Sequence, residues 1–124
     1  MSYHVQQMFE VLSDRKLKKQ EVHSDRDYDG GGWFDEKTTS LYLYSDKSFA
    51  LIIESFTSVS SGGFSIPSQS KNEHYGSWDI IEEYNLLYLI LFYQDGSQEK
   101  LQTKNLGTGL HELNYQIWHR YLIE

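Results

Sequence analysis

The chain has 124 residues, 39% of them hydrophobic, which is enough for one domain with a modest core. Its 11 lysines and arginines are outnumbered by 18 aspartates and glutamates, and the net charge of -7 repels nucleic-acid phosphate and anionic lipid. There is no cysteine, so disulfides, thiolate metal sites and cysteine nucleophiles are excluded.

No targeting or membrane-spanning segment is recognisable in the sequence. The start, MSYHVQQMFEVLSDRK, carries polar side chains throughout and lacks the unbroken apolar run of a signal peptide. No later stretch approaches the ~20 apolar residues of a membrane span. The basic cluster RKLKK at 15–19 is short and is typical of a solvated strand or helix end. We therefore expect a cytoplasmic protein that binds neither nucleic acid nor membrane.

The composition favours β-structure with one short helix. Aromatic residues make up 15% of the chain and include ten tyrosines, which suits strands and surfaces where one end of the ring meets water. A helix is predicted at about residues 4–13, because Val5, Met8, Phe9 and Leu12 recur at the three-and-four spacing of one helix face.

A hairpin is predicted after the helix. The polar segment 16–23 either continues the helix or forms an edge strand, and we favour the strand. In TTSLYLYS, leucines alternate with Tyr42 and Tyr44. The turn sequence SDKS at 45–48 leads into FALIIESF, which alternates again, so these two runs are predicted to pair.

A long mobile loop is predicted at about residues 57–74. This segment is rich in serine and glycine, holds the only proline of the chain and shows no apolar period. Such a loop either covers a ligand site or is disordered.

The last third of the chain is predicted to supply the central and closing strands. Trp78 and Ile80 lead through a Glu-Glu-Tyr-Asn turn into the apolar run 86–92, the predicted central strand, and QDGS at 94–97 is a hairpin signal. EKLQTK, NLGTG, LHELNY and QIWHRYLI are predicted to form a strand, a turn and closing strands. Seven or eight strand candidates at short spacing predict an antiparallel barrel or sandwich.

The order of these segments resembles the small bacterial lipocalin-like domains of the calycin type. The segments that carry the resemblance are LYLYSDKSF, GSWDI, LLYLILFYQDGS and LHELNYQIWHR, within residues 41–121. The resemblance implies an all-β, antiparallel up-and-down barrel with the helix at one end and an apolar ligand in its mouth or interior. It does not imply catalysis. Lipocalins proper carry Gly-x-Trp near the N-terminus, whereas Gly76 and Trp78 lie in mid-chain.

The segment DRDYDGGGWFDE matches the spacing of the calcium loop D-x-D-x-D-G-x5-E. The matching residues are Asp25, Asp27, Asp29, Gly30 and Glu36. An EF-hand needs a helix on each side and usually an apolar eighth residue, but that position is Gly32 and the next segment is a predicted strand. A hairpin loop that wraps a calcium ion and a plain acidic turn both remain open, and calcium is the one cofactor that the sequence suggests.

Titratable residues give few candidates for catalysis, and no catalytic residue is assigned. None of the histidines has the helical spacing of a zinc pair; they are His4, His23, His74, His111 and His119. Glu82 and Glu83 are adjacent, so on a strand they point to opposite faces and a charged turn is favoured. Glu54 would have a raised pKa and act on a ligand if its face lined a barrel interior, but it is an ordinary residue if it faces outward.

The candidate ligand-binding residues are mostly aromatic. They would line a pocket if the barrel encloses a ligand, although aromatic residues at alternating strand positions are also common in a plain core. The set is Tyr42, Tyr44, Glu54, Phe56, Trp78, Tyr88, Phe92 and Trp118.

Three functional hypotheses follow from the sequence. The first is a barrel that binds a small apolar or aromatic molecule, and it predicts an internal cavity. The second is a protein-interaction or regulatory module that buries the outer faces of its two-sided strands in a homodimer or against a partner. The third is a small enzyme that uses Glu54 or a histidine as acid or base. We rank them in this order.

Overall fold

The computed structural model describes residues 2–26, 32–61 and 64–123. One helix precedes eight strands. In chain order the elements are α1 (Tyr3–Leu12), β1 (Arg15–Arg26), β2 (Gly32–Leu43), β3 (Ser48–Ser61), β4 (Phe64–Glu83), β5 (Leu86–Tyr93), β6 (Gln98–Gly107), β7 (Leu110–Leu113) and β8 (Gln116–Leu122).

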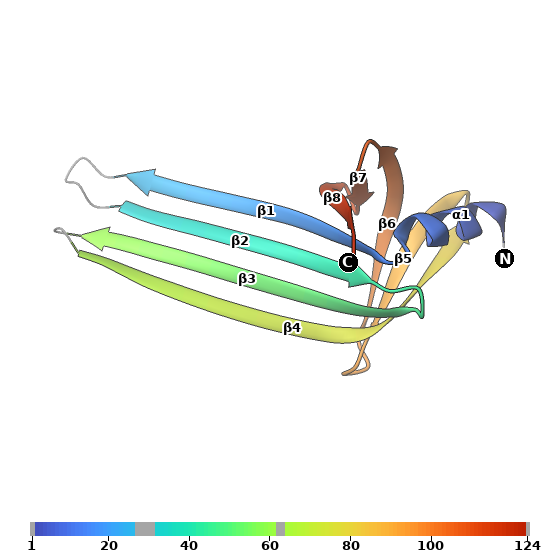
Figure 1. Cartoon of the computed structure of the whole chain (residues 1–124), viewed down its shortest axis with the longest axis horizontal. Coiled ribbons are helices and arrows are strands. Elements are labelled where there is room, and N and C mark those ends of the chain that lie inside the picture. Colours follow the sequence, from blue (N-terminus) through green and yellow to red (C-terminus); the bar gives the residue numbers. More distant parts are fainter. Residues whose placement is uncertain (1, 27–31, 62–63, 124) are drawn as a thin grey trace.

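The eight strands form a closed antiparallel barrel in which each strand pairs with its neighbour in the sequence (Figure 1). The first and last strands close the ring, because Arg15 to Lys18 of β1 pair with Leu122 to His119 of β8. The predicted all-β, up-and-down barrel with a short N-terminal helix is therefore confirmed.

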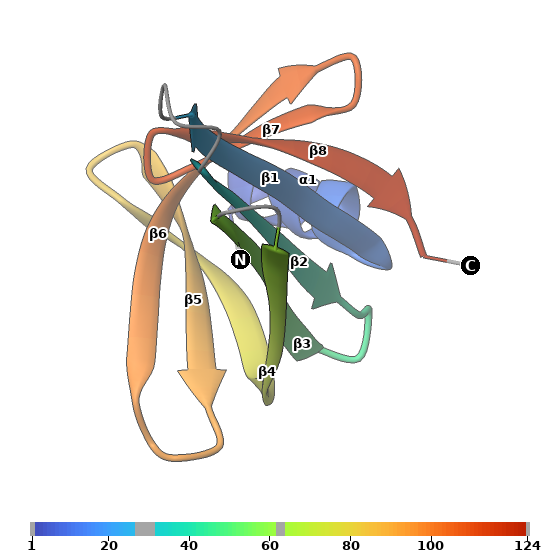
Figure 2. The same cartoon turned by 90° about the vertical axis from the view of Figure 1, so that its left-hand side faces the viewer.

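Strands β1 to β4 extend well beyond the barrel as an open sheet, which we call the arm (Figure 1). It comprises residues 19–26, 32–39, 53–61 and 64–72, which pair with one another in register. The barrel ends where the short strands end, because β8 pairs with β1 only as far as Lys18 and β5 pairs with β4 only from Gly76 onward. Figure 2 looks along the arm toward the barrel and shows β5 to β8 completing the ring behind it.

Helix α1 packs into the end of the barrel opposite the arm. Ser2 caps it, and its hydroxyl oxygen accepts a hydrogen bond from the Val5 amide at 3.2 Å. Val5, Met8 and Leu12 are buried in the barrel core, as their spacing predicts, and the ring of Phe9 stacks on Trp78 with centroids 5.0 Å apart. The helix thus plugs one end and leaves the arm end for a cavity.

Alternation along each strand builds the core. Inward-facing positions of the barrel are fully or almost fully buried; they include Leu17, Leu41, Leu43, Phe49, Trp78, Leu89, Leu91 and Leu113. Gly76 lies where β4 and β5 approach closely, since a β-carbon there would lie 1.9 Å from the carbonyl oxygen of Phe92. The predicted central strand 86–92 corresponds to β5, which is buried at its middle and exposed at Leu86 and Phe92.

The prediction of a mobile loop at 57–74 is wrong for the residues described there, because they belong to β3 and β4. The β3–β4 ladder continues without a break from Ser48 and Ser77 to Ser61 and Phe64. The apolar period is missing because both faces of the arm are open to water, so the strand needs no buried side. Cross-strand pairing supplies the order instead, and the hydroxyl of Thr57 also donates to the carboxylate of Asp35 at 3.1 Å.

The predicted tight turns are confirmed. In the β2–β3 turn, the Asp46 carboxylate accepts from the amide of Ser48 at 2.8 Å and from its hydroxyl at 2.5 Å. Asp95 and Ser97 repeat this pattern with the same distances in the β5–β6 turn. The pKa of each aspartate is lowered, mainly by the hydrogen bond from the serine hydroxyl.

No helix in the described part of the chain is long and apolar enough to cross a membrane.

Candidate functional site

A cavity of about 300 Å³ lies in the barrel where the arm begins, and we call it the mouth cavity. Its floor is apolar and its rim is polar. The lining residues are Lys19, Lys37, Thr39, Leu41, Leu51, Ile53, Leu91, Glu99, Leu101, Leu113, Asn114, Gln116 and Trp118. A volume of this size is at the lower end of the range for small-molecule sites, and polar and apolar residues line it in similar numbers.

Successive inward positions of β2 show how the sequence forms this cavity. From the core toward the arm, these positions are Leu43, Leu41, Thr39 and Lys37. The leucines and Thr39 are buried, whereas Lys37 is exposed at the rim. One strand therefore supplies the floor, the wall and a charged edge of the same cavity through its period of two.

Trp118 of β8 combines burial with an unused polar group. It is 7% exposed and lines the mouth cavity. Its indole Nε1 is buried and has no hydrogen-bond partner among the described residues. A buried N–H without an acceptor is costly and uncommon in native proteins. An acceptor atom on a bound molecule would remove this cost.

Charged groups surround the cavity rim. The ammonium of Lys19 lies 5.0 Å from the centre of the Trp118 ring, 3.6 Å from the carboxylate of Glu21, and donates a hydrogen bond to the side chain of Gln116. The hydroxyl of Tyr93 donates to the Glu99 carboxylate at 3.1 Å. Burial, with the nearby charge of Glu99 as the next cause, raises the pKa of Tyr93 to about 12, so this hydroxyl stays protonated as a donor.

The structure places two of the predicted ligand-binding residues on the inner face of the barrel, at opposite ends. Trp118 lines the mouth cavity. Trp78 is 1% exposed and packs under helix α1, where its indole Nε1 donates to the carbonyl of Tyr44 at 2.9 Å. Trp78 is therefore part of the core at the plugged end.

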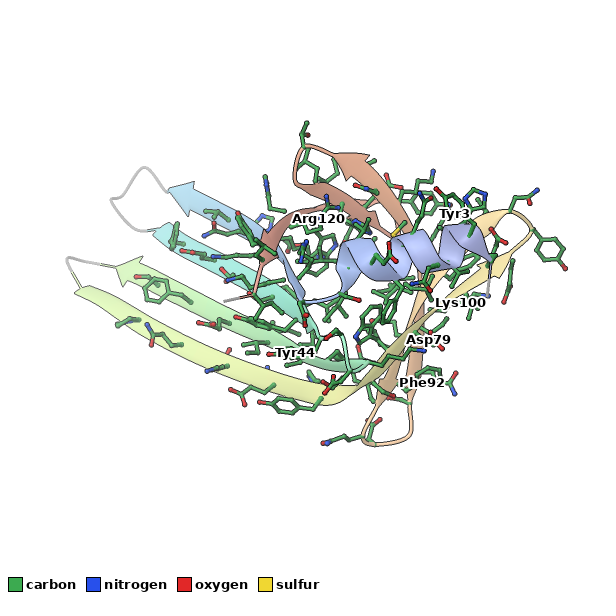
Figure 3. The ribbon with its side chains drawn as sticks, turned by 45° about the vertical axis from the view of Figure 1, so that its right-hand side comes forward. Tyr3, Tyr44, Asp79, Phe92, Lys100 and Arg120 are labelled. Atoms are coloured by element: carbon green, nitrogen blue, oxygen red, sulfur yellow. The ribbon has the colours of Figure 1, made fainter. Side chains whose placement is uncertain are left out.

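Four predicted aromatic residues lie on the outside of the barrel. Tyr42 and Tyr88 alternate with inward leucines. A lysine ammonium from the neighbouring strand lies over each ring: that of Lys16 is 5.6 Å from the centre of the Tyr42 ring, and that of Lys100 is 4.4 Å from the centre of the Tyr88 ring. Phe92 is 38% exposed beside the β5–β6 hairpin, and Tyr44 lies in the β2–β3 connection (Figure 3). Sequence alternation identified the two faces but not which one is inward.

Glu54 and Phe56 lie on the outer face of the arm. Glu54 is exposed, opposite Thr38 on β2 and Lys71 on β4. Phe56 packs against Phe34 with ring centroids 6.1 Å apart. Both residues line an open hollow of about 430 Å³ with Glu36 and Lys71. This hollow faces away from the mouth cavity, so Glu54 does not line the barrel interior.

The calcium hypothesis falls largely outside the described residues. Asp27, Asp29 and Gly30 lie there, and of Asp25 only the backbone is described, opposite Trp33. Glu36 lies on β2 opposite Val22, and its carboxylate accepts a hydrogen bond from Gln20. Within the described ranges, no three histidine, aspartate or glutamate side chains gather closely enough to hold a metal ion. The calcium loop stays a prediction.

A buried polar chain that links β6, β7 and β8 to helix α1 was not identified from the sequence. His111 is fully buried, with Nε2 at 2.5 Å from the hydroxyl oxygen of Thr103 and Nδ1 at 3.2 Å from the guanidinium of Arg120. The Thr103 hydroxyl donates in turn to the sulfur of Met8 at 3.9 Å. Burial, and secondly the charge of Arg120, lowers the pKa of His111 to about 4, so the imidazole is neutral.

Sequence reasoning also missed the charged rim of the mouth cavity. Lys19 belongs to the basic cluster that looked like a solvated strand end, and Lys37 stands alone in a polar segment. The available signal was register: Lys19 and Lys37 lie on paired strands, each on the same face of its strand as inward leucines, Leu17 on β1 and Leu41 on β2. That register is visible only after the strands are paired.

Comparison with protein-family models, with curated proteins and with solved structures found no match. The function must therefore be argued from the geometry of the site.

Proposed function

We propose that this chain is a lipocalin-like binding protein whose small-molecule ligand occupies the mouth cavity. The observation that carries the proposal is the buried indole N–H of Trp118, a residue that lines the mouth cavity of about 300 Å³; this N–H has no partner in the described residues. The ligand is then largely apolar and presents a hydrogen-bond acceptor to Trp118.

The up-and-down order of eight strands supports the lipocalin-like part of the proposal. Strands in this order form a closed barrel that is just wide enough to hold side chains or one small ligand. In this chain the helix fills one end, and near the other end the smaller Thr39 follows the leucines on the inward face of β2. The space left at that end is the proposed binding site.

The enzyme hypothesis gains no support from this geometry. Glu99 is the one carboxylate among the residues that line the mouth cavity, and it is already engaged by Tyr93. Glu54 lies outside, and His111 is enclosed between Thr103 and Arg120. The homodimer that would bury the outer strand faces stays a prediction.

A pair of neighbouring residues provides the test. Ile53 lines the mouth cavity, whereas Ile52 precedes it on β3 and faces the other side. We expect the fluorescent apolar dye Nile red to bind the wild-type chain and Ile52→Trp, but not Ile53→Trp, whose larger ring fills the cavity. Circular dichroism and thermal unfolding of both variants control for misfolding. Absence of binding to the wild type, or unchanged binding to a folded Ile53→Trp, would contradict the proposal.

The role of Trp118 is tested separately. Nile red carries a carbonyl, and Trp118→Phe keeps an aromatic ring while it removes the N–H donor. We expect this variant to bind the dye roughly fivefold more weakly, which corresponds to the loss of one neutral hydrogen bond. Equal affinity would show that the ligand does not use the indole N–H.

A further inference from the structure

Two donor groups at the mouth cavity have no partner among the described residues. The Glu21 carboxylate lies 3.6 Å from the ammonium of Lys19, and the Glu99 carboxylate accepts from Tyr93. By contrast, the indole N–H of Trp118 has no partner, and Lys37 makes no ion pair with any described residue. The cavity therefore offers two donors without a described partner, while the two nearby carboxylates, Glu21 and Glu99, are engaged.

Lys37 differs in this respect from the lysines that pair with carboxylates. Five lysines make such pairs within 4 Å; they are Lys19, Lys47, Lys71, Lys100 and Lys104. Lys37 lies opposite Glu21 in register, but Glu21 is held by Lys19 on its own strand. Its ammonium therefore has no ion-pair partner among the described residues, and it lies at the rim of the mouth cavity in a chain of net charge -7.

The charged residues and the apolar residues of the mouth cavity lie in different parts of it. Lys19 and Lys37 come from paired strands at the arm end of the cavity, whereas Leu91, Leu101 and Leu113 form its apolar part. A molecule that places an apolar chain on the leucines brings its other end to the lysines. An anionic group there would meet a free ammonium, which forms stronger hydrogen bonds with an anion than with a neutral acceptor.

Resting on the proposed function, we infer that the ligand is an amphiphile with an apolar chain and an anionic head group, bound with the head at Lys37. Lys19 adds positive charge from the neighbouring strand. Trp118 lines the same cavity with its ring centre 5.0 Å from the ammonium of Lys19, so its N–H is available to donate to an oxygen of the head. Lys37 is thus the residue that sets specificity for the charge of the ligand.

Three probes with the same chain and different heads test this inference. Isothermal titration calorimetry compares decanoate, decanol and decyltrimethylammonium on the wild-type chain. We expect decanoate to bind roughly tenfold more tightly than decanol, and the cation to bind most weakly. Equal affinity for decanoate and decanol, or preference for the cation, would overturn the inference while Nile red binding still upholds the cavity. Failure of all the probes and of Nile red would overturn both.

A charge variant with a matched control locates the head group. Lys37→Gln removes the free ammonium, and we expect it to lose the roughly tenfold preference for decanoate while its affinity for decanol stays unchanged. Lys104→Gln makes the same change in net charge on β6, outside the cavity lining, and should keep the preference. If both variants lower decanoate affinity equally, the effect comes from net charge and the assignment of Lys37 is wrong.

Discussion

His111 illustrates how hydrogen bonds to neighbouring side chains stabilise a buried titratable residue. Its Nδ1 accepts from the guanidinium of Arg120, and its Nε2–H donates to Thr103. This arrangement requires the neutral imidazole, because a proton on Nδ1 would face the positive charge of Arg120. Arg120 is itself held by Asn105, whose amide oxygen accepts from the guanidinium at 3.0 Å. The side chains of β6, β7 and β8 are linked in this way.

The pKa of His111 predicts a loss of stability in acid. Its value falls from 6.5 in the unfolded chain to about 4 in the folded one, so the unfolded state binds the proton first as the pH falls. The contribution of His111 to the free energy of unfolding is fully present above about pH 6.5 and is lost as the pH falls through about 4. The loss is about 3 kcal/mol at most. Urea unfolding of wild type and His111→Gln at several pH values measures it. The wild type should lose more stability over this range, and parallel profiles would contradict the assignment.

Residue-scale properties were only partly accessible from the sequence. The sequence named His111 and Trp118, but it could not separate a buried histidine from an exposed one, because both occur in strands of mixed polarity. Burial depends on which strand lies opposite, and His111 pairs with Trp118 across the β7–β8 hairpin. The missing information is therefore tertiary in origin.

At the scale of elements, turns were the best predicted feature because their chemistry is local. The Glu-Glu-Tyr-Asn turn joins β4 to β5 through Tyr84 and Asn85, whose φ angles are 52° and 67°. Two consecutive left-handed residues define the turn type that matches the twist of a hairpin. Tyrosine is an unusual choice for this conformation, and Tyr84 is 95% exposed, so little packing compensates for it.

This turn can be improved by design. The double variant Tyr84→Asn/Asn85→Gly gives the Asn-Gly pair that the left-handed turn favours, and we expect the free energy of unfolding to rise by about 1 kcal/mol. Asn85→Ala should have the opposite sign, because alanine tolerates a positive φ less well than asparagine. Chemical denaturation of the three proteins measures both effects. A destabilised double variant would show that Tyr84 makes a contribution that its exposure does not reveal.

The strands of the arm show where element prediction failed. Leucine and tyrosine alternation located β2 and the start of β3, because one face of each is buried there. From residue 53 the same strand lies in the arm, and past residue 56 serine and threonine replace most apolar residues without ending the ladder. Apolar residues alternate along a strand only where one of its faces is buried. A strand with both faces in water lacks this pattern, and its sequence therefore resembles that of a loop.

At the scale of the whole molecule, the arm has two free edges. Along the outer part of β4, the odd-numbered residues direct their backbone N–H and C=O groups away from β3, because the carbonyl of Tyr75 accepts from Gln94 of the β5–β6 turn. Pro67 occupies such a position, so its missing N–H costs no β3–β4 hydrogen bond. Lys71 and Glu73 are exposed on the same edge and ion-pair at 3.1 Å. Proline and charge are features that limit pairing between edge strands.

Removing these charges should allow the arms to pair. We expect Lys71→Val/Glu73→Val to self-associate with rising protein concentration in sedimentation velocity, because the free backbone groups of this edge then lie beside apolar β-branched side chains. Lys104→Val/Glu112→Val makes the same exchange on strands that are paired on both sides, and it leaves the net charge equally unchanged. If this control associates to the same extent, surface hydrophobicity rather than the free edge is the cause.

The sequence by itself determined the class of the fold, the helix, the turns and the buried strand β5, because each depends on neighbours within a few residues. It also excluded cysteine chemistry outright. Only the tertiary structure decided which face of each strand is inward, that Tyr42 and Tyr88 are outside, and that Lys19, Lys37 and Trp118 surround one cavity. The physical reason is register: the period of a strand separates two faces, but closure of the barrel through β1 and β8 is what makes one of them the inside.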